Sequence, residues 1–143
     1  MSIPSPAHIL VIDEIPLIAV GLQEVLRSID PALHVEYTET VFTALSARSF
    51  EGTTWDMIIL GSTEESPPGN LVLPAAELRQ KFPGSRIMIY TDRYDPAVIS
   101  QVAAGAIDAC VHKHEGAEEI LKAWRHLSAG ETYLSPKFTR DPL

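Results

Sequence analysis

The sequence predicts one α/β domain built on a doubly wound parallel sheet, and three observations lead to this prediction. Short apolar runs of strand length alternate along the chain with longer stretches that have helical spacing. The runs at 8–12, 56–60 and 86–90 are apolar nearly throughout, as expected of strands covered on both faces. The chain has 143 residues, a usual size for one domain with its own core. Together these features favour a sheet with helices on both faces.

The expected elements follow in order along the chain. Five strands are expected, at 8–12, 33–37, 56–60, 86–90 and 108–112. Five helices alternate with them, at 16–29, 40–50, 70–82, 95–106 and 116–131, the third beginning near Pro74 or slightly before it. Residues at the helix ends support these limits: Pro16 and Pro96 in first turns, Asp95 as an N-cap, and Gly105 and Gly130 as stops. We expect a domain over residues 1–131, with loose segments at 61–70 and in a tail at 132–143.

Composition excludes several classes of function. The net charge is −8 and the 11 basic residues are scattered, so the chain is a poor ligand for nucleic acid or for an anionic membrane. The single cysteine, Cys110, excludes a disulfide within the chain and a thiolate metal cluster. The first residues lack the basic and long apolar regions of a signal peptide, and no apolar run is long enough for a membrane span. We therefore expect a cytoplasmic protein.

Chemistry in such a sheet gathers beyond the carboxyl ends of the strands. Asp13 and Glu14 follow the first strand, Gly61 the third, Thr91 the fourth and Lys113 the fifth. Paired carboxylates suit Mg²⁺, and a hydroxyl with an ammonium group suits phosphoryl oxygens. The arrangement resembles a phosphoryl site whose third strand delivers no side chain. Without any resemblance, the favoured interpretation of Asp13 and Glu14 is that they are plain acids at a helix N-terminus, stabilised by the helix dipole.

Four stretches resemble the receiver domain of bacterial response regulators, a CheY-like domain with the flavodoxin-like fold. "ILVIDE" resembles the first strand of these domains with its acidic pair, "RIMIYTD" the fourth strand, and "QVAAGAIDACVHK" the stretch that ends in the family's lysine. "AWRHLSAGETYLSP" is similar to the end of receivers in NarL/LuxR-type regulators, just before their DNA-binding domain. The resemblance implies the strand order 2-1-3-4-5. It also implies that residues 132–143 are a possible linker to a DNA-binding domain absent from this sequence.

Two positions depart from the family pattern. Alignment on the third strand places Gly61 where the family has its phosphoacceptor aspartate, and glycine can neither accept a phosphoryl group nor bind Mg²⁺ through a side chain. Cys110 stands where the family has a switching Tyr or Phe, three residues before the lysine. We therefore expect no cofactor, and at most weak Mg²⁺ binding at Asp13 and Glu14. Lys113 is expected to pair with one of these acids, and Thr91 to cap the following turn.

The resemblance and these departures together predict an atypical receiver that regulates transcription without phosphorylation and is not an enzyme. Its partner is expected to be a protein or a second copy of the chain, with DNA bound only through a separate C-terminal domain. The expected interaction face lies on the fourth helix, fifth strand and fifth helix. It comprises Val98, Gln101, Val102, His112, Ile120, Ala123 and Trp124.

Alternatives stay open at this point. Glu64 or Glu65 could supply a displaced carboxylate, either phosphorylated with Mg²⁺ at the acidic pair or acting as a fixed charge. The pocket vacated at Gly61 could hold a small ligand. Cys110 could be a redox sensor, although a buried thiol is favoured. His112 and His114 have no third metal ligand in the sequence pattern. A flavin or dinucleotide site is disfavoured, because the loop "IDEIP" after the first strand is acidic and would repel phosphate.

Overall fold

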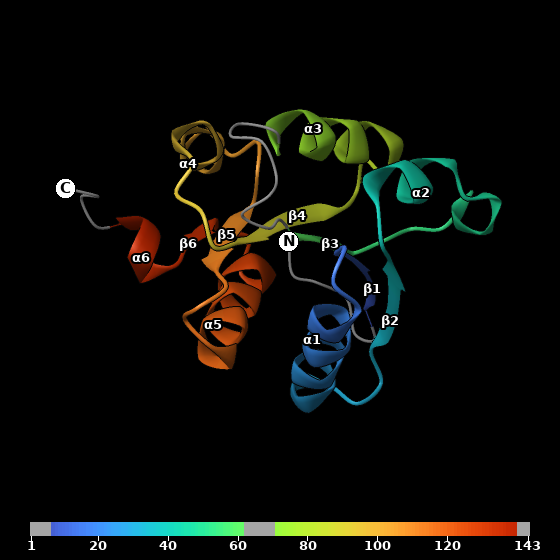
Figure 1. Ribbon diagram of the computed structural model, residues 1–143, viewed down its shortest axis with the longest axis horizontal. Coiled ribbons are helices and arrows are strands. Elements are labelled where there is room, and N and C mark those ends of the chain that lie inside the picture. Colours follow the sequence, from blue (N-terminus) through green and yellow to red (C-terminus); the bar gives the residue numbers. More distant parts are fainter. Residues whose placement is uncertain (1–6, 62–70, 140–143) are drawn as a thin grey trace.

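The computed structural model describes residues 7–61 and 71–139, and it confirms the doubly wound parallel sheet (Figure 1). The strands lie in the order β2-β1-β3-β4-β5-β6, and every pair is parallel. Their bounds are β1 His8–Ile12, β2 His34–Thr38, β3 Met57–Gly61, β4 Arg86–Thr91, β5 Ala109–His112 and β6 Tyr133–Leu134. The helices are α1 Pro16–Ile29, α2 Val41–Ser46, the 3-10 turn η1 Arg48–Phe50, α3 Val72–Lys81, α4 Pro96–Ala103, α5 Ala117–Ser128 and α6 Pro136–Thr139.

The sheet separates two apolar layers. In Figure 1, α1 and α5 lie on one side of the sheet, and α2, α3 and α4 on the other. Because successive strand residues point to opposite faces, β3 contributes Met57 and Ile59 to the first layer and Ile58 and Leu60 to the second. This explains why the run at 56–60 is apolar throughout. None of the helices in the described part of the chain is both long and apolar enough to cross a membrane.

The helix ends follow from local chemistry. The Asp95 carboxylate accepts the N–H of Ala97 at 3.0 Å and caps α4, and Pro96 occupies the first position of that helix. Pro74 lies inside the first turn of α3, where a missing N–H breaks no helical hydrogen bond. The expected helix at 40–50 is instead two pieces, because Ala47 between α2 and η1 has an extended conformation.

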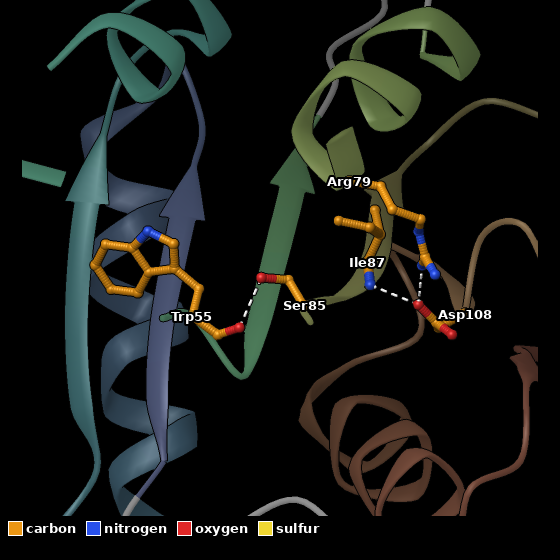
Figure 2. A network of polar contacts seen from close by, with 5 residues as sticks. All are labelled: Trp55, Arg79, Ser85, Ile87 and Asp108. Atoms are coloured by element: carbon orange, nitrogen blue, oxygen red, sulfur yellow. Dashed lines mark hydrogen bonds and ion pairs between the residues drawn. The ribbon is translucent and has the colours of Figure 1, made fainter. Parts of the chain in front are cut away.

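Polar contacts at the amino end of the sheet join the entries of three strands (Figure 2). The Ser85 hydroxyl donates to the Trp55 carbonyl oxygen at 2.6 Å, which ties the entry of β4 to that of β3. The Asp108 carboxylate accepts the N–H of Ile87 at 2.8 Å and forms an ion pair with Arg79 of α3. These contacts lie at the opposite end of the sheet from the acidic pair, so we interpret them as structural.

The C-terminal region differs most from the expectation. Residues 133–139 are not a tail: β6 adds a sixth strand beside β5, and α6 follows it directly. Ser135 is fully buried and Phe138 is 4% exposed. The expectation of a loose tail over 132–143 is therefore wrong for residues 133–139, which pack on the sheet. That the end of the chain leads to a DNA-binding domain stays a prediction. Residues 140–143 lie outside the described part.

Candidate functional site

The site at the carboxyl ends of the strands is built around a buried ion pair. Asp13, directly after β1, is 1% exposed, and its Oδ2 lies 3.3 Å from Nζ of Lys113, directly after β5. The other carboxylate oxygen, Oδ1, accepts the N–H of Ile15 at 2.8 Å. Lys113 therefore pairs with Asp13 and not with Glu14, whose side chain is exposed. Both oxygens of the central carboxylate are engaged within the protein.

The Asp13 carboxylate occupies the space in which a side chain at position 61 would begin. A Cβ atom built on Gly61 would lie 2.0 Å from Asp13 Oδ2, 2.8 Å from its Cγ and 3.2 Å from the Ile12 carbonyl oxygen. Contacts below 3.0 Å are essentially never seen for real Cβ atoms. The backbone at Gly61 is not among those with positive φ, so glycine is required here by lack of space. The pocket expected beside Gly61 is thus filled at its centre by Asp13.

Thr91 and Tyr90 border the ion pair from β4. Thr91 is 1% exposed, and its hydroxyl oxygen accepts the N–H of Arg93 at 3.2 Å, as expected of a residue that caps the following turn. Its carbonyl oxygen accepts the N–H of Lys113 at 3.0 Å, which fixes the end of β5 against β4. Lys113 Nζ lies 5.7 Å from the centre of the Tyr90 ring. Burial, and secondarily the charge of Asp13, raises the pKa of the Tyr90 hydroxyl.

The donors at this site fit a magnesium ion poorly. Mg²⁺ requires near-octahedral oxygen ligands and loses its waters reluctantly. Asp13 already binds an ammonium group and a backbone N–H, and Gly61 supplies no carboxylate. Over residues 7–61 and 71–139, no three His, Cys, Asp or Glu side chains lie close enough together to hold a metal ion. His112 and His114 accordingly form a pair of rings 5.3 Å apart without a third ligand in that part of the chain.

A cavity of about 240 Å³ opens beside the ion pair, between the carboxyl ends of β1 and β3 and the starts of α2 and α3. Its walls are Ile12, Glu14, Glu39, Thr40, Val41, Leu60, Gly61, Leu71 and Pro74. The lining combines apolar side chains with two exposed carboxylates. This cavity is the part of the pocket expected beside Gly61 that Asp13 does not fill. Glu64 and Glu65, the candidates for a displaced carboxylate, lie outside the described residues.

Cys110 is a buried core residue. It is 1% exposed on β5 and belongs to the same apolar cluster as Val98, Val102 and Phe138. Burial, with a smaller contribution from the charge of Asp95, raises the pKa of its thiol strongly. A redox sensor needs an accessible thiol with a depressed pKa, so these properties weigh against that alternative.

The expected interaction face needs correction. Val98, Val102, Ile120 and Ala123 are each at most 2% exposed, because these positions of α4 and α5 point towards the sheet. They are core residues and cannot form a surface in this conformation. Gln101, His112 and Trp124 are partly exposed. Whether the remaining surface of α4, β5 and α5 binds a partner stays a prediction.

The contacts of β5 with the C-terminal residues were not foreseen from the sequence. The His112 N–H donates to the Ser135 hydroxyl at 2.9 Å, and the His112 ring lies 5.2 Å from the Phe138 ring. Burial is the main cause that lowers the pKa of His112; Lys137 and His114 lower it further, while Glu115 and Asp92 oppose them. The signal available in the sequence was three large apolar residues in this short segment, Tyr133, Leu134 and Phe138.

Comparisons with known proteins found similarity to solved structures alone. No family model matches the chain, and no curated protein matches it. The isolated receiver domain of RcsB from Salmonella enterica serovar Typhimurium superposes with a TM-score of 0.75 at 19% identity, over 95% of this chain and 98% of that domain. A LuxR-family two-component response regulator from Aurantimonas sp. SI85-9A1 gives 0.75 at 23% identity, over 94% of each chain.

A longer RcsB chain from Salmonella typhimurium gives a TM-score of 0.76 at 18% identity; the match covers 98% of this chain and 65% of that one. The chain thus spans about two thirds of the longer regulator and nearly all of an isolated receiver domain. At these identities the likeness concerns the fold. The chain therefore has the fold of the receiver domains of LuxR-family response regulators.

Proposed function

We propose that the chain is an atypical receiver domain of a bacterial response regulator, which acts in cytoplasmic signalling and transcription regulation without phosphorylation. The observation that carries this proposal is the Asp13 carboxylate, which lies where the side chain of a phosphoacceptor would begin. A phosphorylatable aspartate at position 61 is absent, and the buried Asp13 is held by Lys113. The lysine that would meet a phosphoryl group is thereby already neutralised by an internal anion.

Its output is protein contact, with a partner or with a second copy, and it has no enzymatic activity and no cofactor. A net charge of −8 disfavours direct contact with DNA, so DNA would be bound only through a separate C-terminal domain. RcsB, whose receiver domain has the same fold, is described as dimers bound to DNA. This analogy of fold supports self-association of the present chain.

A beryllofluoride titration tests the proposal. Beryllofluoride imitates a phosphoryl group on an aspartate in the presence of Mg²⁺, and an RcsB receiver domain has been crystallised with it. We expect no saturable, Mg²⁺-dependent change in the amide NMR spectrum or in the fluorescence of Trp55 and Trp124. A receiver that carries the usual aspartate serves as the positive control. A saturable change that disappears in Asp13→Asn but persists in Glu36→Gln, an exposed acid on β2, would refute the proposal.

Phosphorylation at a displaced carboxylate is a separate outcome. Glu64 and Glu65 lie outside the described residues, so a phosphorylation assay is needed to test them as acceptors. Incubation with a small phosphodonor and Mg²⁺, followed by intact-mass analysis, should leave the mass unchanged. A phosphorylated species that is lost in the Glu64→Gln, Glu65→Gln double variant would establish the displaced site instead.

The 240 Å³ cavity favours one second candidate, a small-ligand sensor. Sites of this kind occur at the carboxyl ends of strands in doubly wound sheets, with mostly apolar walls and a few polar groups. A thermal-shift screen of metabolites tests it. A true ligand should lose its effect in Glu39→Gln, which changes the cavity wall, and keep it in Glu36→Gln, which lies on β2 and does not line the cavity.

A further inference from the structure

Residues 133–139, here called the C-terminal strap, are held on β5 by backbone hydrogen bonds. The Tyr133 N–H donates to the Asp108 carbonyl oxygen at 3.0 Å, and the Ser135 N–H to that of Cys110 at 3.0 Å. In return, the Ser135 hydroxyl accepts the N–H of His112 at 2.9 Å. The fully buried Ser135 thus bonds β5 in both directions. This pattern fixes the register of the strap on the strand.

The strap also inserts one aromatic ring into a groove of the domain. Phe138 is 4% exposed and packs against the His112 ring, in the same apolar cluster as Val98, Val102 and Cys110. We call the site lined by these four residues of α4 and β5 the α4–β5 groove. Figure 1 shows β6 and α6 at the same end of the sheet as α4 and α5.

The connection between the strap and the rest of the domain is short and exposed. Residues 129–132 join α5 to β6, all four are exposed, and Gly130 reverses the chain with a φ of +82°. Besides Phe138, the partly buried Tyr133 and Leu134 pack against the core. The Tyr133 hydroxyl donates to the Glu119 carboxylate, and the Lys137 N–H donates to Glu115 Oε1 at 3.0 Å. A terminal segment of seven residues with these few contacts can open as a unit while the core stays folded. The strap therefore offers the groove a defined shape, a two-residue strand followed by one helical turn that carries the buried Phe138 ring.

We propose that the α4–β5 groove is an exchangeable docking site, closed in the single chain by its own strap and in a dimer by the strap of a second copy. Every contact made within one chain is reproduced between two chains when straps are exchanged reciprocally, and the resulting dimer closes with two-fold symmetry. The segment that the structure shows in the groove is this chain's own, which is why the occupant is a second copy. The proposal rests on the proposed function, for which it names the partner and the surface.

Removal of the connection tests the proposal. Deletion of residues 130–132 leaves one residue between α5 and β6, too few to reverse the chain into its own groove. We expect this variant to be a dimer, as measured by light scattering. The amides of Ser135 and His112 should still be protected from hydrogen exchange, because the strap of the second copy covers them. The dissociation constant should fall at least about tenfold below that of the wild type, whose own strap competes for the groove at high effective concentration.

Two further variants identify the contact. Phe138→Ala in the deletion background should return the chain to a monomer. Phe42→Ala makes the same change at a residue of α2 that is 78% exposed, and it should leave the dimer intact. A monomeric deletion variant with unprotected strap amides would overturn the proposal, and so would a dimer that survives Phe138→Ala.

A second measurement applies if the deletion variant does not fold. The peptide AGETYLSPKFT, residues 129–139, is titrated into the full chain carrying Phe138→Ala. Saturable shifts of the Cys110 and His112 amides are expected with this peptide and not with its Phe-to-Ala version; their absence would overturn the proposal. These experiments contain neither Mg²⁺ nor beryllofluoride. A response to beryllofluoride would thus refute the proposed function without bearing on strap exchange.

Discussion

A single methyl group added at Gly61 should destabilise the protein, although alanine is at least as compatible with a strand as glycine. The new Cβ would lie 2.0 Å from Oδ2 of Asp13, so the carboxylate must turn away. When it moves, it loses the Lys113 ammonium group at 3.3 Å and the Ile15 N–H at 2.8 Å. Gly61→Ala therefore tests whether the buried ion pair and the glycine depend on each other.

The magnitude follows from the contacts that are lost. Breaking a buried ion pair by removing one partner costs about 3–5 kcal/mol, and losing a hydrogen bond to a charged group about 1.5–3 kcal/mol. A carboxylate that turns towards solvent recovers part of this by hydration. Alanine also restricts the unfolded chain, which returns about 0.4–1 kcal/mol. We expect a net loss of about 2–4 kcal/mol in the free energy of unfolding.

Urea denaturation in a double-mutant cycle measures this coupling. With the ion pair removed by Asp13→Ala and Lys113→Met, the same Gly61→Ala change should cost less than about 0.5 kcal/mol, because its Cβ then has room. Gly21→Ala is the matched control: its Cβ meets no atom within 4 Å, and in a helix it should stabilise by about 0.5–1 kcal/mol. An equal loss with and without the ion pair would refute the reasoning, as would no loss in the wild-type background.

Three other predictions concern the ion pair and the strap. Lys113→Met should cost about 3–5 kcal/mol in urea denaturation, because Asp13 stays buried without its cation; a loss below 1 kcal/mol would contradict this. The lowered pKa of His112 means that the unfolded chain binds the proton more readily. The stability that neutral His112 contributes is therefore complete above about pH 6.5, and it is lost as the pH falls through that value towards the pKa of the folded state. His112→Gln should flatten this pH dependence of the free energy of unfolding. Phe138→Ala should cost about 3–5 kcal/mol, against less than about 0.5 kcal/mol for the exposed Phe42→Ala; similar losses would contradict the burial of the ring.

The sequence was sufficient for strands β1 to β5 and for bringing Asp13 and Lys113 to one site. Strands buried on both faces are apolar at consecutive positions, and this signal is strong for 8–12, 56–60 and 86–90. Parallel strands bring their carboxyl ends to one edge, so Asp13 and Lys113 could be placed together although 100 residues separate them. The rotamer of Asp13 could not be read in this way. It depends on the space left at Gly61, which only the packed backbone defines.

The C-terminal strap escaped prediction for a different reason. A strand of two residues, Tyr133–Leu134, is shorter than any window in which alternation can be recognised. The predicted interaction face was wrong for four of its residues, because they are buried and not exposed. Apolar residues at helical spacing mark the buried side of a helix. Val98 and Val102, four positions apart on α4, are such a stripe. Exposed and buried apolar residues look alike in sequence, and packing decides between them.

One missing carboxylate separates this site from a magnesium site, and Gly61→Asp tests that statement. The new side chain would displace Asp13 from Lys113, because its Cβ lands on the Asp13 carboxylate. The lysine would then face the new aspartate, while Asp13 turns outward beside the exposed Glu14. Three neighbouring carboxylates repel one another, and a divalent cation relieves that repulsion by binding.

Mg²⁺ should therefore raise the thermal unfolding midpoint of Gly61→Asp, because only a folded state that binds the ion is stabilised by it. The midpoints of the wild type and of the uncharged Gly61→Asn should stay unchanged. Equal shifts in all three proteins would show that the ion binds elsewhere and that the glycine is not what closes the site.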